Sequence, residues 1–142
     1  MPILNYTTKV DVFQSLGEIQ ASLVKHGARK ILQDFDEKQR VSAISFMIET
    51  PAGQKYIRLP ANVKAVLKVL KEHGVKCDQD QAERVAWRIT KDWVQAQMAI
   101  LEAEMVSMEE VFFPYLLDGS GEKTLFEAYR EKQQHLISGG NA

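Results

Sequence analysis

The sequence lacks most features that would assign it to a particular compartment. Its single cysteine, Cys77, excludes an internal disulfide and fits a reducing environment. No apolar run approaches the roughly 18 residues of a membrane span. The first ten residues also lack the basic and then apolar regions of a secretory signal. We therefore expect a cytoplasmic protein with no membrane partner.

The sequence has little net charge, −1 at pH 7, which argues against bulk binding to nucleic acid. The charges are nevertheless unevenly distributed. Residues 54–76 contain six Lys/Arg and one acid, whereas residues 99–131 contain eight acids. A basic middle and an acidic end can attract each other between subunits or serve separate partners.

Motifs that identify an enzyme are also missing. The three histidines and Cys77 have no zinc-ligand spacing, and no nucleophile elbow, P-loop or dinucleotide fingerprint occurs. We therefore predict a protein that is not an enzyme and has no cofactor or metal. Asp34 and Asp36 point to the same side at the end of a predicted strand, so a metal-dependent hydrolase remains an alternative. A polar hairpin end explains the two residues more simply.

The patterns that are present predict an α+β fold in one domain. β-branched and aromatic residues indicate about four antiparallel strands, at residues 3–10, 28–36, 41–49 and 54–59. A Ser15–Glu18 capping box predicts a helix that ends at Gly27. We expect a strand-rich part at residues 1–60, with its small sheet packed on helices, a helical part at 61–136 and a flexible tail at 137–142.

Local capping patterns mark the helices of the second half. An asparagine or aspartate precedes two of the predicted helices as a candidate N-cap. At the starts of two further predicted helices, a serine or threonine is followed three residues later by a glutamate, which is the capping-box pattern. These caps are Asn62, Asp78 or Asp80, Ser107 with Glu110, and Thr124 with Glu127.

The stretch from Ala82 to Met105 is the longest helical pattern and is apolar on two sides. The expected core stripe comprises Val85, Ala86, Ile89, Trp93, Ala96, Ile100 and Ala103. A second stripe follows heptad spacing and comprises Trp87, Val94, Met98, Leu101 and Met105. Two interpretations remain open for the second stripe: burial inside one domain, or an oligomer interface.

Basic residues beside aromatic rings give the strongest indication of a ligand. Arg84, Arg88 and Lys91 follow one face of the long helix beside Trp87, and Arg58 lies near Tyr56 on a predicted strand. Arginine beside a ring can hold a phosphate and stack a base. These six residues are the predicted anion-binding site. The alternatives are a solvated face, or pairing with the acidic third across a subunit interface.

The segments GEIQASLVKHGARKILQDFD, YIRLP, AERVAWRITKDWVQAQ and FFPYL together resemble a family of small, mostly uncharacterised proteins encoded by bacteriophages and integrated mobile elements. The resemblance implies an accessory gene acting in the host cytoplasm. Such genes commonly make nucleic-acid-binding proteins or inhibitors of host defence. The family offers no active-site residues to transfer.

Three functional hypotheses follow. The first is a non-enzymatic, homo-oligomeric binding protein that counters host defence by occupying a defence protein or sequestering a nucleotide-type ligand. The second is a nucleic-acid-binding accessory protein for replication or recombination, whose binding would weaken steeply with salt. The third is the hydrolase with Asp34 and Asp36.

Overall fold

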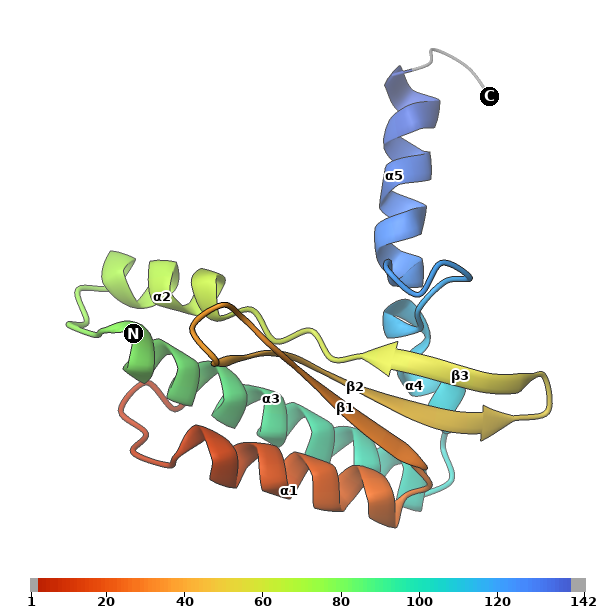
Figure 1. Ribbon diagram of the computed structural model, residues 1–142, viewed down its shortest axis with the longest axis horizontal. Helices are drawn as coiled ribbons and strands as arrows, with labels where there is room; N and C mark the ends of the chain where they lie inside the picture. Colours follow the sequence, from red (N-terminus) through yellow and green to blue (C-terminus); the bar gives the residue numbers. More distant parts are fainter. Residues whose placement is uncertain (1–2, 139–142) are drawn as a thin grey trace. The chain divides into compact units, whose positions relative to one another are not determined.

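The computed structural model describes residues 3–138, and residues 1–2 and 139–142 lie outside the described part, including most of the predicted tail. The fold is α+β, as predicted, but the described residues form three strands instead of about four. The elements in chain order are α1 (Val12–Lys25), β1 (Lys30–Phe35), β2 (Val41–Thr50), β3 (Gly53–Arg58), α2 (Val63–Glu72), α3 (Gln79–Glu102), α4 (Met108–Val111), the 3-10 helix η1 (Phe113–Tyr115) and α5 (Leu125–Ser138). Figure 1 labels the α-helices and the strands.

Contacts within the chain group into two compact units, each made of two separate segments. Unit 1 holds the described parts of Met1–His26 and Pro60–Met105, and unit 2 holds those of Gly27–Leu59 and Val106–Ala142. The predicted strand-rich and helical parts are continuous in sequence and do not coincide with these units.

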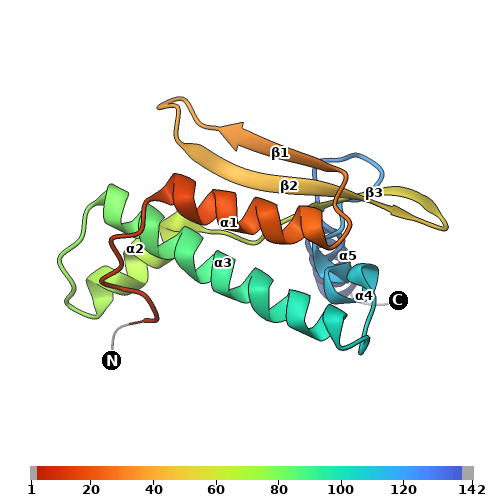
Figure 2. The same ribbon diagram turned by 90° about the horizontal axis from the view of Figure 1, so that it is seen from below.

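Unit 1 is helical, with α1 and α2 each in contact with α3. Figure 2 shows α1 running beside α3. Helix α1 buries Leu16, Ile19 and Leu23, all at most 1% exposed, on one side. Their spacing of three and four residues gives the helix a single apolar stripe.

The amino-terminal segment 3–10, predicted as a strand, contains turns instead. The backbone amides of Tyr6 and Thr8 donate to the carbonyls of Ile3 and Asn5. The Gln81 side chain on α3 donates to the carbonyls of Tyr6 and Thr8, at 3.1 and 2.9 Å. The segment therefore satisfies part of its backbone through a helix side chain, which no local β propensity could indicate.

Helix α1 begins before the predicted Ser15–Glu18 capping box, so that prediction was wrong. Asp11 is the N-cap and accepts a hydrogen bond from the Phe13 amide at 3.0 Å. Ser15 is fully buried inside the helix, and both Ser15 and Glu18 contact Arg88 of α3. The serine–glutamate spacing serves a contact between helices here.

Unit 2 is built on the antiparallel sheet β1-β2-β3. Strand β2 is buried from Ile44 to Ile48, so both of its faces are covered, as its sequence predicts. The predicted turn joins β2 to β3, and the Thr50 hydroxyl donates to the Gly53 carbonyl at 2.8 Å. Gly53 has a φ of +110°, a conformation that favours glycine.

The carboxyl-terminal segment covers the outer edge of β3. Leu116 forms an isolated bridge with Ile57, and the Leu117 amide donates to the Tyr56 carbonyl at 2.8 Å. The rings of Phe46 and Phe112 meet edge to face, with centroids 5.3 Å apart. Unit 2 therefore closes one side of its sheet with residues distant in sequence.

The buried face of α3 differs from the expected core stripe. Ala96 and Ala103 are exposed, and Ile89, Trp93 and Ile100 are only partly buried. The buried residues are Ala82, Val85, Ala86, Trp87, Thr90, Val94 and Met98. Thr90 belongs to this face because its hydroxyl donates to the Ala86 carbonyl at 2.8 Å. A hydroxyl bonded to its own helix can be buried, which an apolar pattern overlooks.

Candidate anion-binding site

Two of the predicted basic residues on α3 are committed to partners within unit 1. Arg88 pairs with Glu18 and donates to the Ser15 hydroxyl at 3.2 Å, and its side chain is 12% exposed. The ammonium group of Lys91 lies 2.9 Å from an Asp92 carboxylate oxygen, and the Lys91 side chain is 13% exposed. Both cations are largely withdrawn from solvent and from any ligand.

The predicted aromatic partner and most of the predicted oligomer stripe are buried. Trp87 is 1% exposed, so its ring offers no face on which a base could stack. Val94 and Met98 are buried as well, whereas Leu101 is partly exposed and Met105 is 72% exposed. Only the last two residues of that stripe are available to a partner, and the oligomer interface there stays a prediction.

Arg84 is placed differently, because it lines an open pocket of about 1150 Å³ in unit 1. The amino-terminal segment, the end of α2, the loop after α2 and the first turns of α3 form the walls. The lining residues are Tyr6, Thr7, Lys9, Asp11, Lys71, Gly74, Val75, Lys76, Cys77, Asp78, Gln81 and Arg84.

The pocket carries an excess of positive charge. Four of its lining residues are cationic and two are acidic. Both acids cap helices: Asp11 accepts from the Phe13 amide and Asp78 from the Gln81 amide, at 3.0 and 2.9 Å. The positive ends of α1 and α3 therefore lie at this pocket, and their charge offsets part of that of the two carboxylates.

Three of the cations have uncommitted ammonium groups. Within the described part of the chain, no hydrogen bond or ion pair engages the side chains of Lys9, Lys71 or Lys76. All three residues are exposed. Their charges are thus available to an anion, in contrast to those of Arg88 and Lys91.

The fourth cation, Arg84, is held in place by Gln81. Its Nε and Nη2 both donate to Gln81 Oε1, at 2.9 and 2.7 Å. The same glutamine side chain donates to the carbonyls of Tyr6 and Thr8. Gln81 thereby joins the amino-terminal wall of the pocket to the arginine, and Arg84 Nη1 remains for a ligand.

The sequence pattern predicted one of the four cations in this pocket as a site residue, Arg84, and did not assign Lys71 or Lys76 to the site. It missed Lys9, which lay in a predicted strand, and it missed Tyr6, a 36% exposed ring in the pocket wall. No pattern of spacing links residues 6–11 to residues 71–84.

The other two predicted site residues, Arg58 and Tyr56, lie in unit 2. Arg58 donates from Nη1 to the Glu122 carbonyl at 3.0 Å and lies 4.0 Å from the Glu127 carboxylate. The pKa of Glu127 is lowered by the Thr124 amide, with Arg58 as a further cause. Arg58 therefore has a structural role that ties β3 to the start of α5.

Tyr56 lines a smaller hollow of about 470 Å³ together with Gln54, Lys55 and residues 117–121. This hollow contains Lys55 and Asp118, one cation and one acid. Its charge is balanced, so it attracts an anion less than the pocket of unit 1 does.

The two aspartates of the hydrolase hypothesis are placed at the β1–β2 hairpin. Asp36 Oδ1 accepts from the amides of Lys38 and Arg40, at 2.8 and 3.0 Å, and so shapes the turn. Among the described residues, no group of three His, Cys, Asp or Glu side chains could hold a metal ion. The hairpin therefore adds no support to a metal-dependent reaction.

No described helix has the length and apolar character to cross a membrane. Comparisons with protein-family models, curated proteins and solved structures find no match for this chain.

Proposed function

We propose that this chain is a non-enzymatic binding protein that captures a phosphate-bearing, nucleotide-type ligand in the pocket of unit 1. The observation that carries the proposal is the set of four cations, three of them without partners among the described residues, around one hollow. Ammonium and guanidinium groups are the usual protein ligands of phosphate oxygens. The ring of Tyr6 supplies an apolar surface for a base.

The shape of the pocket favours a small ligand over a duplex. Its volume, about 1150 Å³, lies slightly above the range of about 300–1,000 Å³ that is typical of small-molecule sites. The four cations gather around one open hollow that can receive the phosphates of a single nucleotide, whereas a duplex needs an extended basic surface. Sequestration of a signalling nucleotide would be a counter-defence activity, in keeping with the resemblance to phage and mobile-element proteins.

Titration calorimetry with adenosine mono-, di- and triphosphate tests the proposal. We expect affinity to rise with the number of phosphates and to fall with salt, because each added charge meets further cations. The variant Lys71→Glu/Lys76→Glu reverses two exposed charges in the pocket wall. Since a hydrogen bond to a charged group contributes about 1.5–3 kcal/mol, affinity should fall at least about a hundredfold.

A matched control is available on the same helix. Lys64→Glu/Lys68→Glu makes the same change of net charge at exposed positions of α2 that do not line the pocket. Its affinity should stay within about threefold of wild type if only long-range charge is altered. Equal losses in both variants, or no binding of any phosphate compound by the wild type, would contradict the proposed site. Binding of single-stranded DNA alone, steeply dependent on salt, would favour the nucleic-acid hypothesis instead.

A further inference from the structure

Strand β1 is an open edge of the sheet in unit 2. The strand order is β1-β2-β3, and residues 116–117 cover the outer side of β3. Within the described part of the chain, β2 is the only strand paired with β1. An uncovered edge presents unpaired amides and carbonyls, and it is a template for another strand.

The register shows which backbone groups of β1 face outward. The Leu59 amide donates to the Ile44 carbonyl, so the polar groups of Ile44 face β3. Direction alternates along a strand, so those of Ser45 face β1. Ser45 is paired with Leu32, and the neighbouring Ile31 and Gln33 therefore direct their amides and carbonyls away from β2.

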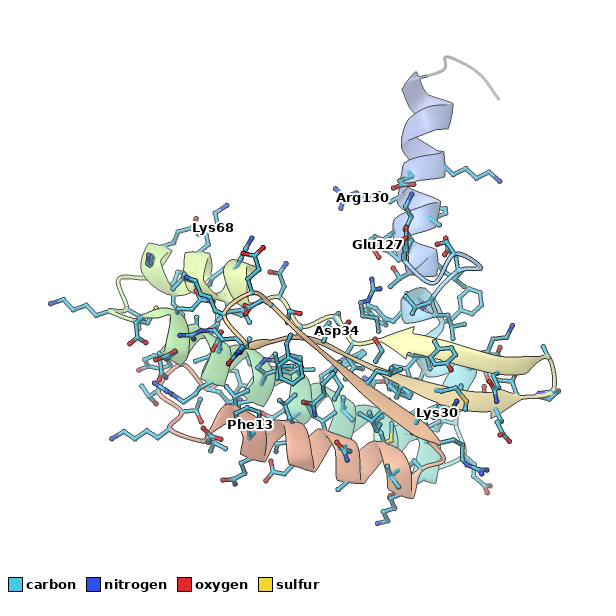
Figure 3. The ribbon with its side chains drawn as sticks, viewed as in Figure 1. Phe13, Lys30, Asp34, Lys68, Glu127 and Arg130 are labelled. Carbon is cyan, nitrogen blue, oxygen red and sulfur yellow. The ribbon has the colours of Figure 1, made fainter. Side chains whose placement is uncertain are left out.

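The side chains of β1 are sorted by face in the same way. Lys30, Leu32 and Asp34 lie on one face and are exposed, Leu32 by 46%. Ile31 and Gln33 lie on the other face and are partly buried. Figure 3 labels Lys30 and Asp34 toward opposite ends of β1. No hydrogen bond or ion pair engages either of these two side chains within the described residues.

We propose that β1 pairs antiparallel with β1 of a second copy of this chain, about a two-fold axis at Leu32. In this register Ile31 of each copy lies opposite Gln33 of the other. These are the residues whose backbone groups face outward, so the two strands can exchange hydrogen bonds. The two sheets would form one continuous sheet across the axis, an isologous interface.

The charges of β1 select a second copy as the occupant. The same register places Lys30 of each chain opposite Asp34 of the other, so the axis creates two opposite-charge pairs on the exposed face. The two Leu32 side chains meet between these pairs at the axis. A register shifted by one pairing step places Asp34 opposite Leu32 or Ala28, and Lys30 opposite Asp36 or Leu32, so neither shift forms the two Lys30–Asp34 pairs. The sequence of β1 is thus complementary to itself in one antiparallel register.

Charge reversal with mixing tests the pairing. Wild-type protein should sediment as a dimer whose dissociation constant rises with salt. Lys30→Glu and Asp34→Lys each convert both cross-strand pairs into like-charge pairs, which should weaken the homodimer by about ten- to a hundredfold. An equimolar mixture of the two variants has opposite charges in both pairs, so it should dimerise about as tightly as wild type.

Two further variants make the result specific. Lys64→Glu carries the same charge change as Lys30→Glu at an exposed position on α2 and should leave the dimer unchanged. Gln33→Pro removes an outward amide while sparing the amides paired with β2, and it should abolish the dimer. Circular dichroism identifies any variant that fails to fold.

The proposal is overturned if the wild type stays monomeric at high concentration. A monomer would mean that the edge is reserved for a strand of a different protein or is kept unpaired by its charges. A dimer that both single variants leave intact, or two variants that do not associate with each other, would equally overturn it.

Discussion

Arg88 links α1 to α3, although its sequence pattern predicted that it would bind a ligand. Its guanidinium contacts Glu18 and the buried hydroxyl of Ser15. Arg88→Met keeps the aliphatic stem but leaves both groups without this partner. We expect a loss of about 2–3 kcal/mol in the free energy of unfolding, measured by urea titration, with nucleotide affinity unchanged.

Arg84→Met is the matched comparison one helical turn earlier. Among the described residues, Arg84 donates only to Gln81, which lies on the same helix, and Arg84 lines the pocket. Its loss should reduce nucleotide affinity about tenfold or more while costing less stability than the loss of Arg88. The reverse outcome, a stable Arg88→Met protein that has lost its nucleotide affinity, would favour the site that the sequence predicted on the face of α3 with Arg88 and Lys91.

Asp92 gives unit 1 a defined response to acid. Burial raises its pKa, but hydrogen bonds from Lys91 and Asn5 and the charges of Lys91 and Arg88 lower it to a net value below the ordinary one. Because the pKa of Asp92 is lower in the folded state than in the unfolded state, the ionised carboxylate stabilises the fold. This contribution is fully present above the unfolded-state pKa of about 3.9, and it is lost as the pH falls through the lower pKa of the folded state.

Asp92→Asn tests this response. The Asp92 carboxylate bonds Asn5 at 2.8 Å and Lys91 at 2.9 Å, and so holds the amino-terminal segment against α3. The variant should be less stable than wild type at pH 7, and the difference in unfolding free energy should shrink toward pH 3. Because the other acids titrate in both proteins, this difference isolates Asp92. A difference independent of pH would contradict the assigned role.

At the scale of elements, local capping patterns predicted the starts of α2, α3, α4 and α5 correctly but not the start of α1, which Asp11 caps. Asn62, Asp78, Ser107 and Thr124 all cap helices, and Ser107 with Glu110 forms a complete capping box. The Ser15–Glu18 pattern has the same spacing but gave a wrong prediction, because both side chains bond Arg88, which lies 73 positions from Ser15 and 70 from Glu18. Local sequence shows that two side chains could bond each other. It does not show a distant competitor.

The second apolar stripe of helix α3 becomes more exposed toward its carboxyl-terminal end, and this difference in burial gives a testable prediction. Met98 is 3% exposed and Met105, just beyond the helix end, is 72% exposed. Met98→Asp should lower the free energy of unfolding by about 3 kcal/mol or more, since it buries a carboxylate. Met105→Asp should change it by less than about 0.5 kcal/mol. Thermal unfolding of both variants measures the contrast.

The same two variants bear on the oligomer interface predicted on α3. If the dimer forms through β1, Met105→Asp should sediment as wild type does. Loss of the dimer in this well-folded variant would instead place an interface at the end of α3. The Met98 variant carries no such information, because its site is buried.

At the scale of the whole molecule, the sequence predicted the elements better than their grouping. Strand β2 and helix α3 were both expected, since their patterns extend over many consecutive residues. The pocket was not, because it joins Lys9 to Lys71 and Arg84 through the tertiary contacts of Gln81. The α+β class therefore follows from local periodicity and propensity, whereas the candidate site depends on long-range contacts that periodicity does not encode.

The division of the chain also sets an order of events during translation. Every residue that lines the pocket, and every segment of unit 1, has been synthesised once the ribosome passes Met105. The segment that covers β3 is made afterwards, and at ordinary rates of synthesis it follows over a few seconds. Unit 1 can therefore begin to form the pocket proposed for the ligand before β3 gains its covering segment.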